Sequence, residues 1–432
     1  MRVAVLGLWH LGSVTAACLA SAGHEVVGLD FDGEAIERLN QGRAPLYEPG
    51  LDELLKEGIS QGKLRFTTDI ADALQEAEIV WVAYDTPVDA NDRADIEFVK
   101  ERIQRLFPFL RPETLVLISS QLPVGSTRDL EENYASSNVG GTVTFAYSPE
   151  NLRLGKAISV FTAPDRVVVG VRGESDREKL GRLLKPFTER VEWMSVESAE
   201  MSKHALNAFF AASIAFINEI AVLCECSGAD AKEVERALKS ESRIGPGAYL
   251  SPGPSFAGGT LARDIMFLKQ IGAKNSRATT LISAVQESNE NHKGWVRHQL
   301  MSLLEDLRGA RIAVWGLAYK PGTDTLRRSS SVELCAWLAE HGARVRAHDP
   351  AIKNLPVELS SVFSISLSPV EVLTDATALV VATPWPEYQS VPPAAVIGAM
   401  ADPLVIDPGR FLAASLGDNP RVRYVTIGRG IE

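Results

Sequence analysis

Residues 3 to 30 read VAVLGLWHLGSVTAACLASAGHEVVGLD, and this stretch decides the fold class. An apolar strand leads into a glycine turn, a helix follows, and a second strand ends in Asp30. This order is typical of the first β-α-β unit of a dinucleotide-binding fold. Gly7 permits the tight turn and Gly12 lets the helix pack closely on the strand, whereas Trp9 stands where a second glycine is expected.

The turn and the acid at its far end predict which dinucleotide would bind. Asp30 lies 18 residues after Gly12 and is placed to accept hydrogen bonds from ribose hydroxyls, which favours NAD over NADP. Trp9 brings a large side chain to where the pyrophosphate would lie. Two interpretations stay open: a cofactor turn with altered phosphate contacts, or a Rossmann-like domain that has lost its cofactor.

Bulk composition limits the class of protein. The chain has 432 residues, enough for about three domains, and a net charge of −11, which argues against a general nucleic-acid binder. Its four cysteines fall in helix-like segments and fit buried thiols in a reducing compartment. Met1 leads directly into the first strand, and we expect no apolar run of the roughly 18 residues that a membrane span needs. We therefore expect a cytoplasmic protein with no membrane partner, no nucleic acid and no metal.

The second half of the chain repeats the pattern of the first. RIAVWGLAY at 311–319 and HGARVRAHDP at 341–350 again give a strand, a glycine turn, a helix and a strand ending in Asp. Later strands correspond too, because IVWVAYDTP and LVVATPWP both end near a Thr-Pro pair. These runs predict an α/β protein with two doubly wound Rossmann-like domains, joined by a long central helix and a helical dimerisation region.

The middle of the chain predicts helix and loop. Apolar residues recur at three- and four-residue spacing from about 198 to Gly228, a plausible helix stop, and this helix is long enough to bridge two domains and offer a dimer face. The stretch 245–259 is rich in Gly and Pro and predicts an ordered loop over a cleft. We place the domains at 1–197, 198–295 and 296–432.

Several motifs together suggest a family. In order they are GRAPLYEPGLDELL, Thr86-Pro87, LPVGST, SPENLRLGKAISVFTAPDRVVVG, EMSKHALNAFFAASIAFINEIAVLCE, RIGPGAYLSPGPSFAGGTLARD, GLAYKPGTDTLRRSSSVEL, HDP and IDPGR. Their order and spacing resemble the nucleotide-sugar 6-dehydrogenases, which include UDP-glucose and GDP-mannose dehydrogenases. The resemblance covers nearly the whole chain and favours the UDP-glucose branch.

The resemblance implies a fold and a reaction. It implies an NAD domain, a central helical dimerisation domain and a C-terminal nucleotide-binding domain, in a homodimer that acts on a UDP-sugar. It also implies two successive oxidations of the sugar C6 hydroxyl to a carboxylate, with two NAD. In that family a cysteine attacks the C6 aldehyde, and a second hydride transfer gives a thioester that water hydrolyses.

The resemblance also assigns residues. The implied catalytic set is Thr260, Lys203, Asn207, Asp264 and Glu150. The implied cofactor-binding set is Gly7, Trp9, Leu11, Gly12, Asp30, Thr86, Gln121, Arg263 and Arg327. The implied substrate-binding set is Leu152, Arg243, Tyr249, Leu250, Gly258, Lys320 and Arg410. Without the resemblance, Lys203 reads as an exposed helix lysine and Glu150 as a solvated loop acid.

Four positions depart from the family pattern. The catalytic cysteine falls on Thr260, the Thr of the STVPVGT motif falls on Gln121, a Lys becomes Arg263, and the RESP element becomes Arg327-Arg328-Ser329-Ser330. A Thr hydroxyl is far harder to ionise than a thiol and needs an adjacent base. An ester formed on it would also hydrolyse much more slowly than a thioester. The second oxidation is therefore the step most at risk.

Three functional hypotheses follow. The first is an NAD-dependent nucleotide-sugar oxidoreductase that lacks the thiol and stops at the aldehyde or runs a redox-neutral reaction. The second is full oxidation to the uronate through Thr260. The third is a non-catalytic nucleotide-sugar or dinucleotide-binding protein. A structural alternative for Thr260 itself is that it caps a helix starting at Leu261, with Asp264 near the capping-box position. We favour the first hypothesis.

Overall fold

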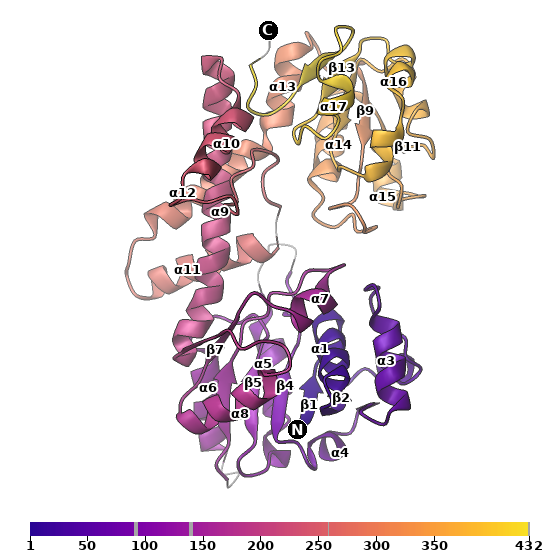
Figure 1. Ribbon diagram of the computed structural model, residues 1–432. Helices are drawn as coiled ribbons and strands as arrows, with labels where there is room; N and C mark the ends of the chain where they lie inside the picture. The colour runs from indigo at the N-terminus through magenta and orange to yellow at the C-terminus, as the bar shows by residue number, and fades with distance from the viewer. Residues whose placement is uncertain (90–93, 138–140, 258, 431–432) are drawn as a thin grey trace. The chain divides into compact units, whose positions relative to one another are not determined.

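The computed structural model describes residues 1–89, 94–137, 141–257 and 259–430 (Figure 1). The chain forms two compact units, Met1–Leu206 and Asn207–Glu432. Each unit is built on its own β-sheet, as the repeated sequence pattern predicts.

The first unit contains an eight-stranded sheet in the order β3-β2-β1-β4-β5-β6-β7-β8. All neighbouring strands are parallel except β6 and β7. The strands are β1 Arg2–Leu6, β2 Glu25–Leu29, β3 Leu64–Thr67, β4 Ile79–Val82, β5 Leu115–Ile118, β6 Thr144–Tyr147, β7 Val167–Gly170 and β8 Val191–Met194. The strand order reverses between β1 and β4, and such a switch point is where doubly wound folds bind ligands at the carboxyl ends of the strands.

Both faces of this sheet are buried because successive side chains of a strand point to opposite faces. Val3 and Val5 of β1 pack with α1, α3, α7 and α8, whereas Ala4 and Leu6 pack with α4, α5, α6 and the start of α9. The helices are α1 His10–Ser21, α2 Gly33–Asn40, α3 Leu51–Ser60, α4 Ile70–Leu74, α5 Ile96–Gln104, η1 Phe107–Phe109, α6 Ser126–Ser136, α7 Ala157–Thr162 and α8 Glu174–Leu184. This two-sided burial explains the nearly continuous apolar runs in the sequence.

The second unit contains a six-stranded, all-parallel sheet in the order β11-β10-β9-β12-β13-β14. Its strands are β9 Arg311–Trp315, β10 Arg344–His348, β11 Ser364–Ile365, β12 Ala378–Val381, β13 Leu404–Ile406 and β14 Arg423–Val425. The order β11-β10-β9-β12 matches β3-β2-β1-β4 of the first unit, so the internal repeat is structural as well as sequential.

The second unit is also rich in helices. They are α10 Ala231–Ser240, α11 Thr260–Lys274, α12 Thr280–Lys293, α13 Trp295–Leu303, α14 Ser330–Glu340, α15 Val357–Ser360, η2 Glu371–Leu373, η3 Pro386–Ser390, α16 Pro393–Ala399 and α17 Ala413–Leu416. Ile265 of α11 and Val285 of α12 pack against Ala211 and Ala215 of α9. Within the described part of residues 241–259 there is neither helix nor strand, which confirms the prediction of a long loop there.

Helix α9, Val196–Ser227, is 32 residues long and ends at Gly228, whose φ of +76° suits only glycine well. Contrary to the sequence expectation, α9 is apolar enough and long enough to cross a membrane by length and composition alone. It nevertheless carries buried polar side chains, among them Glu200, His204, Asn207 and Asn218, each hydrogen-bonded within its own unit. Buried polar groups need such partners, so these parts of α9 belong to the interiors of the two units.

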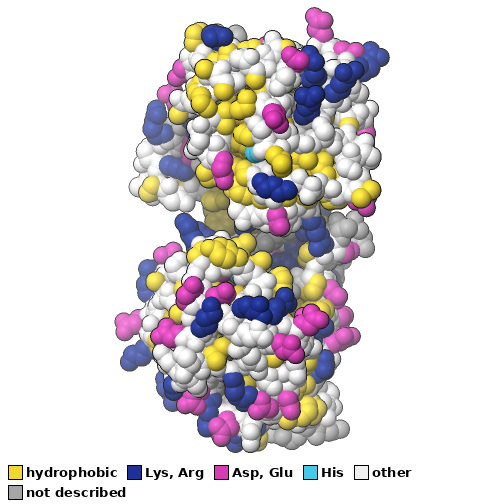
Figure 2. All heavy atoms as spheres, turned by 90° about the vertical axis from the view of Figure 1, so that its right-hand side faces the viewer, with side chains coloured by type: hydrophobic (Ala, Val, Ile, Leu, Met, Phe, Trp, Pro, Cys, Tyr) yellow, Lys and Arg dark blue, Asp and Glu magenta, His cyan; other side chains and the backbone are white. Residues whose placement is uncertain are grey.

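Charges of both signs are mixed on the surface. On the face shown in Figure 2, Lys and Arg side chains alternate with Asp and Glu over each unit, and no extended single-sign patch is visible there.

Candidate active site

The glycine turn after β1 shows why two glycines are retained. Gly7 has φ +88°, and a Cβ there would lie 2.7 Å from the ring of Tyr84. A Cβ on Gly12 would lie 1.7 Å from the carbonyl oxygen of Gly7. Trp9 has an ordinary φ of −72°, and its side chain is 52% exposed. The fold itself therefore demands Gly7 and Gly12, whereas the middle position is restricted only by what approaches the turn from outside.

Asp30 organises this turn directly. Its Oδ2 accepts the backbone N–H of Leu8 at 2.7 Å, and its Oδ1 accepts the N–H groups of Phe31 at 2.7 Å and Asp32 at 3.2 Å. A carboxylate has about four acceptor sites, so capacity for a ribose hydroxyl remains. The sequence argument gave Asp30 only the ribose role and missed this structural one.

The matching turn of the second unit is built differently. Gly316 has φ +94° and sits against Thr383, as Gly7 sits against Tyr84. Here Asp349 Oδ2 accepts the N–H groups of both Leu317 and Ala318 at 2.7 and 2.8 Å, and also Trp385 Nε1 at 3.0 Å.

The two turns also differ in where the following helix begins. In the second unit α14 begins only at Ser330 and is capped by the Ser329 hydroxyl, so its glycine turn does not lead directly into a helix. In the first unit α1 begins at His10, three residues after Gly7, and no side chain caps it. A helix N-terminus directly after a glycine turn is the feature that binds phosphate, and it occurs at the turn of the first unit.

Two of the predicted cofactor residues meet at the carboxyl ends of β4 and β5. The Thr86 hydroxyl donates to the carbonyl oxygen of Gln121 at 2.8 Å. Thr86 is buried and Gln121 is partly buried. The structure thus brings these two residues together beside the switch point of the sheet.

Glu150 lies on the loop after β6. Burial raises the pKa of its carboxyl group, although the charge of Lys203 and the N–H of Leu152, 2.7 Å from Oε2, act in the opposite direction. A carboxyl with a raised pKa is suited to accept a proton near neutral pH. Glu150 and Leu152 also line a cavity of about 80 Å³ in the first unit.

Lys203 is fixed against the same loop. Its Nζ donates to the carbonyl oxygen of Glu150 at 2.6 Å and to Asn151 Oδ1 at 3.1 Å. The exposed lysine that helix periodicity alone predicts is not what the structure contains: the side chain is partly buried and directed to the Glu150 loop. The two catalytic candidates of the first unit therefore lie together.

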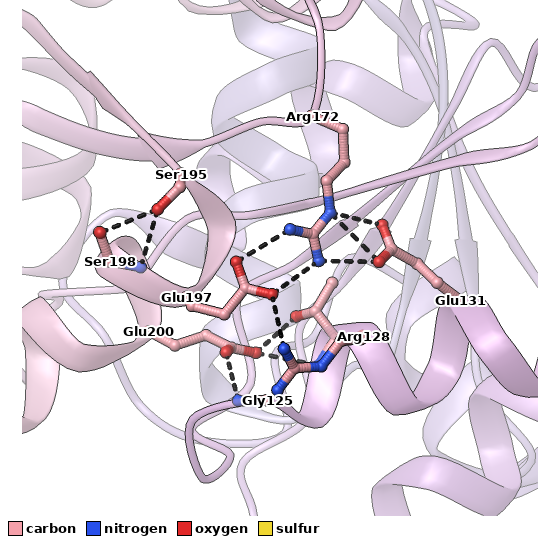
Figure 3. Close-up of polar contacts among 9 residues, drawn as sticks. Gly125, Arg128, Glu131, Arg172, Ser195, Glu197, Ser198 and Glu200 are labelled. Atoms are coloured by element: carbon pink, nitrogen blue, oxygen red, sulfur yellow. Dashed lines mark hydrogen bonds and ion pairs between the residues drawn. The ribbon is translucent and has the colours of Figure 1, made fainter.

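The residues around Lys203 on α9 hold the loop that contains Gln121. Glu200, fully buried, accepts the N–H groups of Gly125 at 2.6 Å and Thr127 at 2.9 Å, and the hydroxyl of Thr127 at 2.7 Å (Figure 3). His204 Nε2 lies 3.1 Å from the carbonyl oxygen of Leu122. The sequence analysis did not single out Glu200 or His204, although their positions three residues before and one residue after Lys203 were a signal.

A second layer of charge supports the start of α9. Arg172 bonds to Glu131 of α6 and to Glu197 of α9, with nearest distances of 2.8 and 2.9 Å, as Figure 3 shows. Hydrogen bonds from Arg172 lower the pKa of Glu197, against the opposing effect of burial. This cluster joins the segment after β7 to α6 and α9.

In the second unit, Asn207 and Asp264 are direct partners. The Asn207 side-chain amide donates to Asp264 Oδ2, and both side chains are buried. Thr260 is the first residue of α11, one turn before Asp264, and is exposed. The alternative in which Thr260 caps a helix starting at Leu261 is wrong: the helix starts at Thr260 itself, and the cap is Gly259, whose φ of +102° suits glycine.

Arg328 is a residue near Thr260 that the sequence analysis did not assign. Its φ is +60°, uncommon for a residue other than glycine, and its Nη1 lies 3.7 Å from where a Cβ on Gly259 would be. Arg327, the assigned residue, is exposed, whereas Arg263 is partly buried on α11. The departure of this segment from the RESP pattern was the available signal.

The predicted substrate residues of the second unit lie in different environments. Arg243 pairs with Glu241 at 3.0 Å and is 87% exposed. Tyr249 is 59% exposed and packs on Phe210, with ring centroids 5.4 Å apart.

The remaining predicted substrate residues differ in how far they are buried. Leu250 is buried and Lys320 is exposed. Arg410 is bonded to Asp230 at 2.8 Å and to the carbonyl of Ile427 at 3.3 Å. Gly258 lies outside the described residues.

The four cysteines are free thiols. Burial raises the pKa of Cys18 to about 12, and it also raises that of Cys335, so neither is a ready thiolate nucleophile. Cys224 is buried as expected, but Cys226 is exposed, contrary to the expectation that all four are buried.

The first doubly wound unit has a glycine turn that leads directly into a helix, and the second has one that does not. This arrangement is typical of a dinucleotide-binding protein with a second α/β half. Three family models match in succession: the NAD-binding domain at 1–188, the central domain at 197–291 and the UDP-binding domain at 313–414 of UDP-glucose/GDP-mannose dehydrogenases. The chain belongs to the UDP-glucose/GDP-mannose dehydrogenase family. It is an NAD-dependent oxidoreductase that acts on a CH–OH group.

Individual relatives agree over the full length. The chain is 35% identical to a UDP-glucose 6-dehydrogenase of Pseudomonas aeruginosa over 96% of this chain and 94% of the relative. It is 32% identical to that of Rhizobium meliloti over 99% and 100%. Among solved structures, a UDP-glucose dehydrogenase from Pyrobaculum islandicum has a TM-score of 0.85 at 31% identity, covering 94% of this chain and 93% of that one.

Proposed function

We propose that this chain oxidises the C6 hydroxyl of a UDP-sugar to the aldehyde with one NAD, and carries the second oxidation slowly or not at all. The observation that carries the proposal is Thr260, an exposed alcohol at the first residue of α11, one turn before the buried Asp264–Asn207 pair. UDP-glucose is the first substrate to test because relatives 35% and 32% identical bear the name UDP-glucose 6-dehydrogenase.

The first oxidation needs only groups that the first unit supplies. NAD⁺ bound at the glycine turn would supply the hydride acceptor for C6, and a base would take the hydroxyl proton, so that alcohol and NAD⁺ give aldehyde, NADH and a proton. Glu150, whose pKa burial raises, serves as that base, and the Lys203 ammonium stabilises the charge that develops on the oxygen.

The second oxidation also needs a nucleophile. A nucleophile must add to the aldehyde before another hydride can leave, and a thiolate does this far better than an alcohol. Addition of the Thr260 hydroxyl would give a hemiacetal, and its oxidation by a second NAD⁺ would give an ester on the enzyme. Water must then cleave that ester, which is less reactive than a thioester.

The test measures how many NADH molecules form per sugar and which product results. Purified protein is incubated with NAD⁺ and UDP-glucose, with other UDP-, GDP-, dTDP- and CDP-sugars in parallel, and the product is identified by mass. One NADH and an aldehyde or its hydrate support the proposal. Two NADH and a uronate would show full oxidation through Thr260. An isomerised sugar without net NADH would indicate a redox-neutral reaction, and binding without any product a non-catalytic protein.

We also propose a homodimer formed through α9. Phe209, Phe216 and Leu223 recur every seven residues along this helix and are 67%, 50% and 62% exposed. Large apolar side chains in a row are typical of an interface rather than of free surface. Light scattering on the wild type and on Phe216→Glu tests this: the wild type is expected at twice the mass of one chain and the variant at a single chain mass.

A further inference from the structure

Glu48 lies where two helices begin. It belongs to the segment before α3 and is only 4% exposed. Its Oε1 accepts the N–H of Ala157, the first residue of α7, at 2.8 Å, and its Oε2 accepts the N–H of Gly155 at 2.8 Å. Oε2 also lies 2.9 Å from Nε2 of His10, the first residue of α1. One buried carboxylate therefore contacts both the cofactor turn and the segment that follows Glu150.

The contacts keep Glu48 ionised. Burial by itself raises the pKa of this carboxyl, but the hydrogen bonds from His10, Gly155 and Ala157 outweigh it and lower the pKa below its ordinary value. The stability of a buried anion depends on all of its hydrogen-bond donors. Loss of one donor leaves the carboxylate incompletely hydrogen-bonded and weakens the whole network. The His10 ring, 14% exposed, is the only side chain among the described residues that bonds to Glu48.

The two segments also face a common cavity. Leu11 and Thr15 of α1 line one side, Val160 and Phe161 of α7 line another, and Glu150 lies at the loop that precedes α7. Any shift of α1 on binding of a diphosphate at its N-terminus would reach the backbone at Gly155 through His10 and Glu48. Discrete hydrogen bonds of this kind are physical elements through which coupling between sites travels.

We infer that His10 and Glu48 form a positioning pair that couples the cofactor turn to the Glu150 loop, so that bound NAD changes the affinity for the UDP-sugar. The inference rests on the proposed function for the identity of the sugar. By linkage, the sugar must change the affinity for the dinucleotide by the same factor. Neither residue touches the reacting atoms in this assignment; both act through the loop that carries Glu150.

The first experiment measures that factor. Dissociation constants of NADH are determined by calorimetry with and without saturating UDP-glucose, for the wild type, Glu48→Gln and His10→Phe. We expect at least about a fivefold coupling in the wild type, a typical allosteric magnitude, and a factor near one in both variants. The control is Glu76→Gln, which removes an acid of a surface pair with Arg2 and should keep the wild-type factor. Equal coupling in all four proteins would overturn the inference.

The second experiment needs no ligand. Hydrogen exchange is followed at the amides of Gly155 and Ala157 in the wild type, His10→Phe and His10→Gln. We expect exchange at least about tenfold faster in His10→Phe, and partial recovery in His10→Gln, whose amide N–H can still donate to Glu48. Unchanged protection in His10→Phe would overturn the coupling regardless of any activity. If instead protection falls but no sugar is oxidised, only the proposed function fails.

Discussion

The Nζ atom of Lys203 lies 2.6 Å from the carbonyl oxygen of Glu150. A cation from α9 is thus fixed by the backbone of the very loop whose carboxyl group is the candidate base. Glu200 and His204, on either side of Lys203 in sequence, hold the Gln121 loop in the same way. The start of α9 therefore positions two loops of the first unit.

Replacing Lys203 by Met should lower kcat for UDP-sugar oxidation by at least about 100-fold, because the negative charge that develops on the C6 oxygen as its proton is removed loses its stabilising cation. The KM for NAD should change little. Initial rates of NADH formation measure both. Lys63→Met is the matched control, since Lys63 forms only a surface pair with Glu25 at 3.6 Å. Equal rates for Lys203→Met and Lys63→Met would remove Lys203 from the chemistry.

Thr260→Cys should add the missing nucleophile. We expect the product to change from aldehyde to uronate and the yield to rise from one to two NADH per sugar, because a thiolate forms the adduct that a second hydride transfer requires. Mass analysis of the product decides. Thr260→Ser keeps an alcohol and should behave as the wild type does. A Cys variant with an unchanged product would show that Thr260 does not occupy the nucleophile position.

Trp9→Gly tests the role of the indole at the cofactor turn. The exposed side chain stands at the N-cap of α1, so we propose that it encloses the dinucleotide. Its removal should weaken NADH binding about five- to tenfold, in line with the loss of one aromatic contact. Trp9→Phe should retain most of the affinity. The same dissociation constant and the same preference for NAD in Trp9→Gly would contradict the proposal.

Glu235→Gln should destabilise the second unit in a pH-dependent way. Burial raises the pKa of Glu235, but hydrogen bonds from Lys232, Lys239 and Ser251 outweigh it and lower the pKa to about 2. A lowered pKa gives stability that is present above the unfolded value of 4.5 and is lost as the pH falls through about 2.

The variant should therefore lose about 3 kcal/mol of unfolding free energy at pH 7. It should lose almost none near pH 2, in denaturant titrations at both pH values. Glu233→Gln, on the same helix but 69% exposed, is the control and should cost far less. A pH-independent loss for Glu235→Gln would mean that packing, not charge, is responsible.

The repeated β-α-β pattern and the apolar strands predicted both sheets, because buried parallel strands leave a strong sequence signal. Helix α9 and its end at Gly228 were likewise predicted, since period and stop residue agree. The expectation that no segment is apolar enough for a membrane was wrong, because α9 combines buried apolar side chains with exposed ones such as Phe209 and Leu223.

The site was only partly predictable. Family motifs pointed to Lys203, Glu150, Asn207 and Asp264, and the structure places the first two together and the last two together. Contacts such as that between Glu48 and His10 join residues 38 apart in sequence and have no periodic signal. The predicted cap of α11 at Thr260 was wrong. The positive φ of Gly259 depends on the loop geometry, which a sequence does not show.

The turn of the second unit bears on how many dinucleotides one polypeptide binds. Asp349 Oδ2 accepts the N–H groups of Leu317, Ala318 and the Trp385 indole, and no helix begins directly at this turn. Each chain should then take up one dinucleotide, not two, and an inhibitor that mimics the NAD diphosphate would meet a single target per chain. The second unit, which matches the UDP-binding domain of the family, would then recognise a different nucleotide.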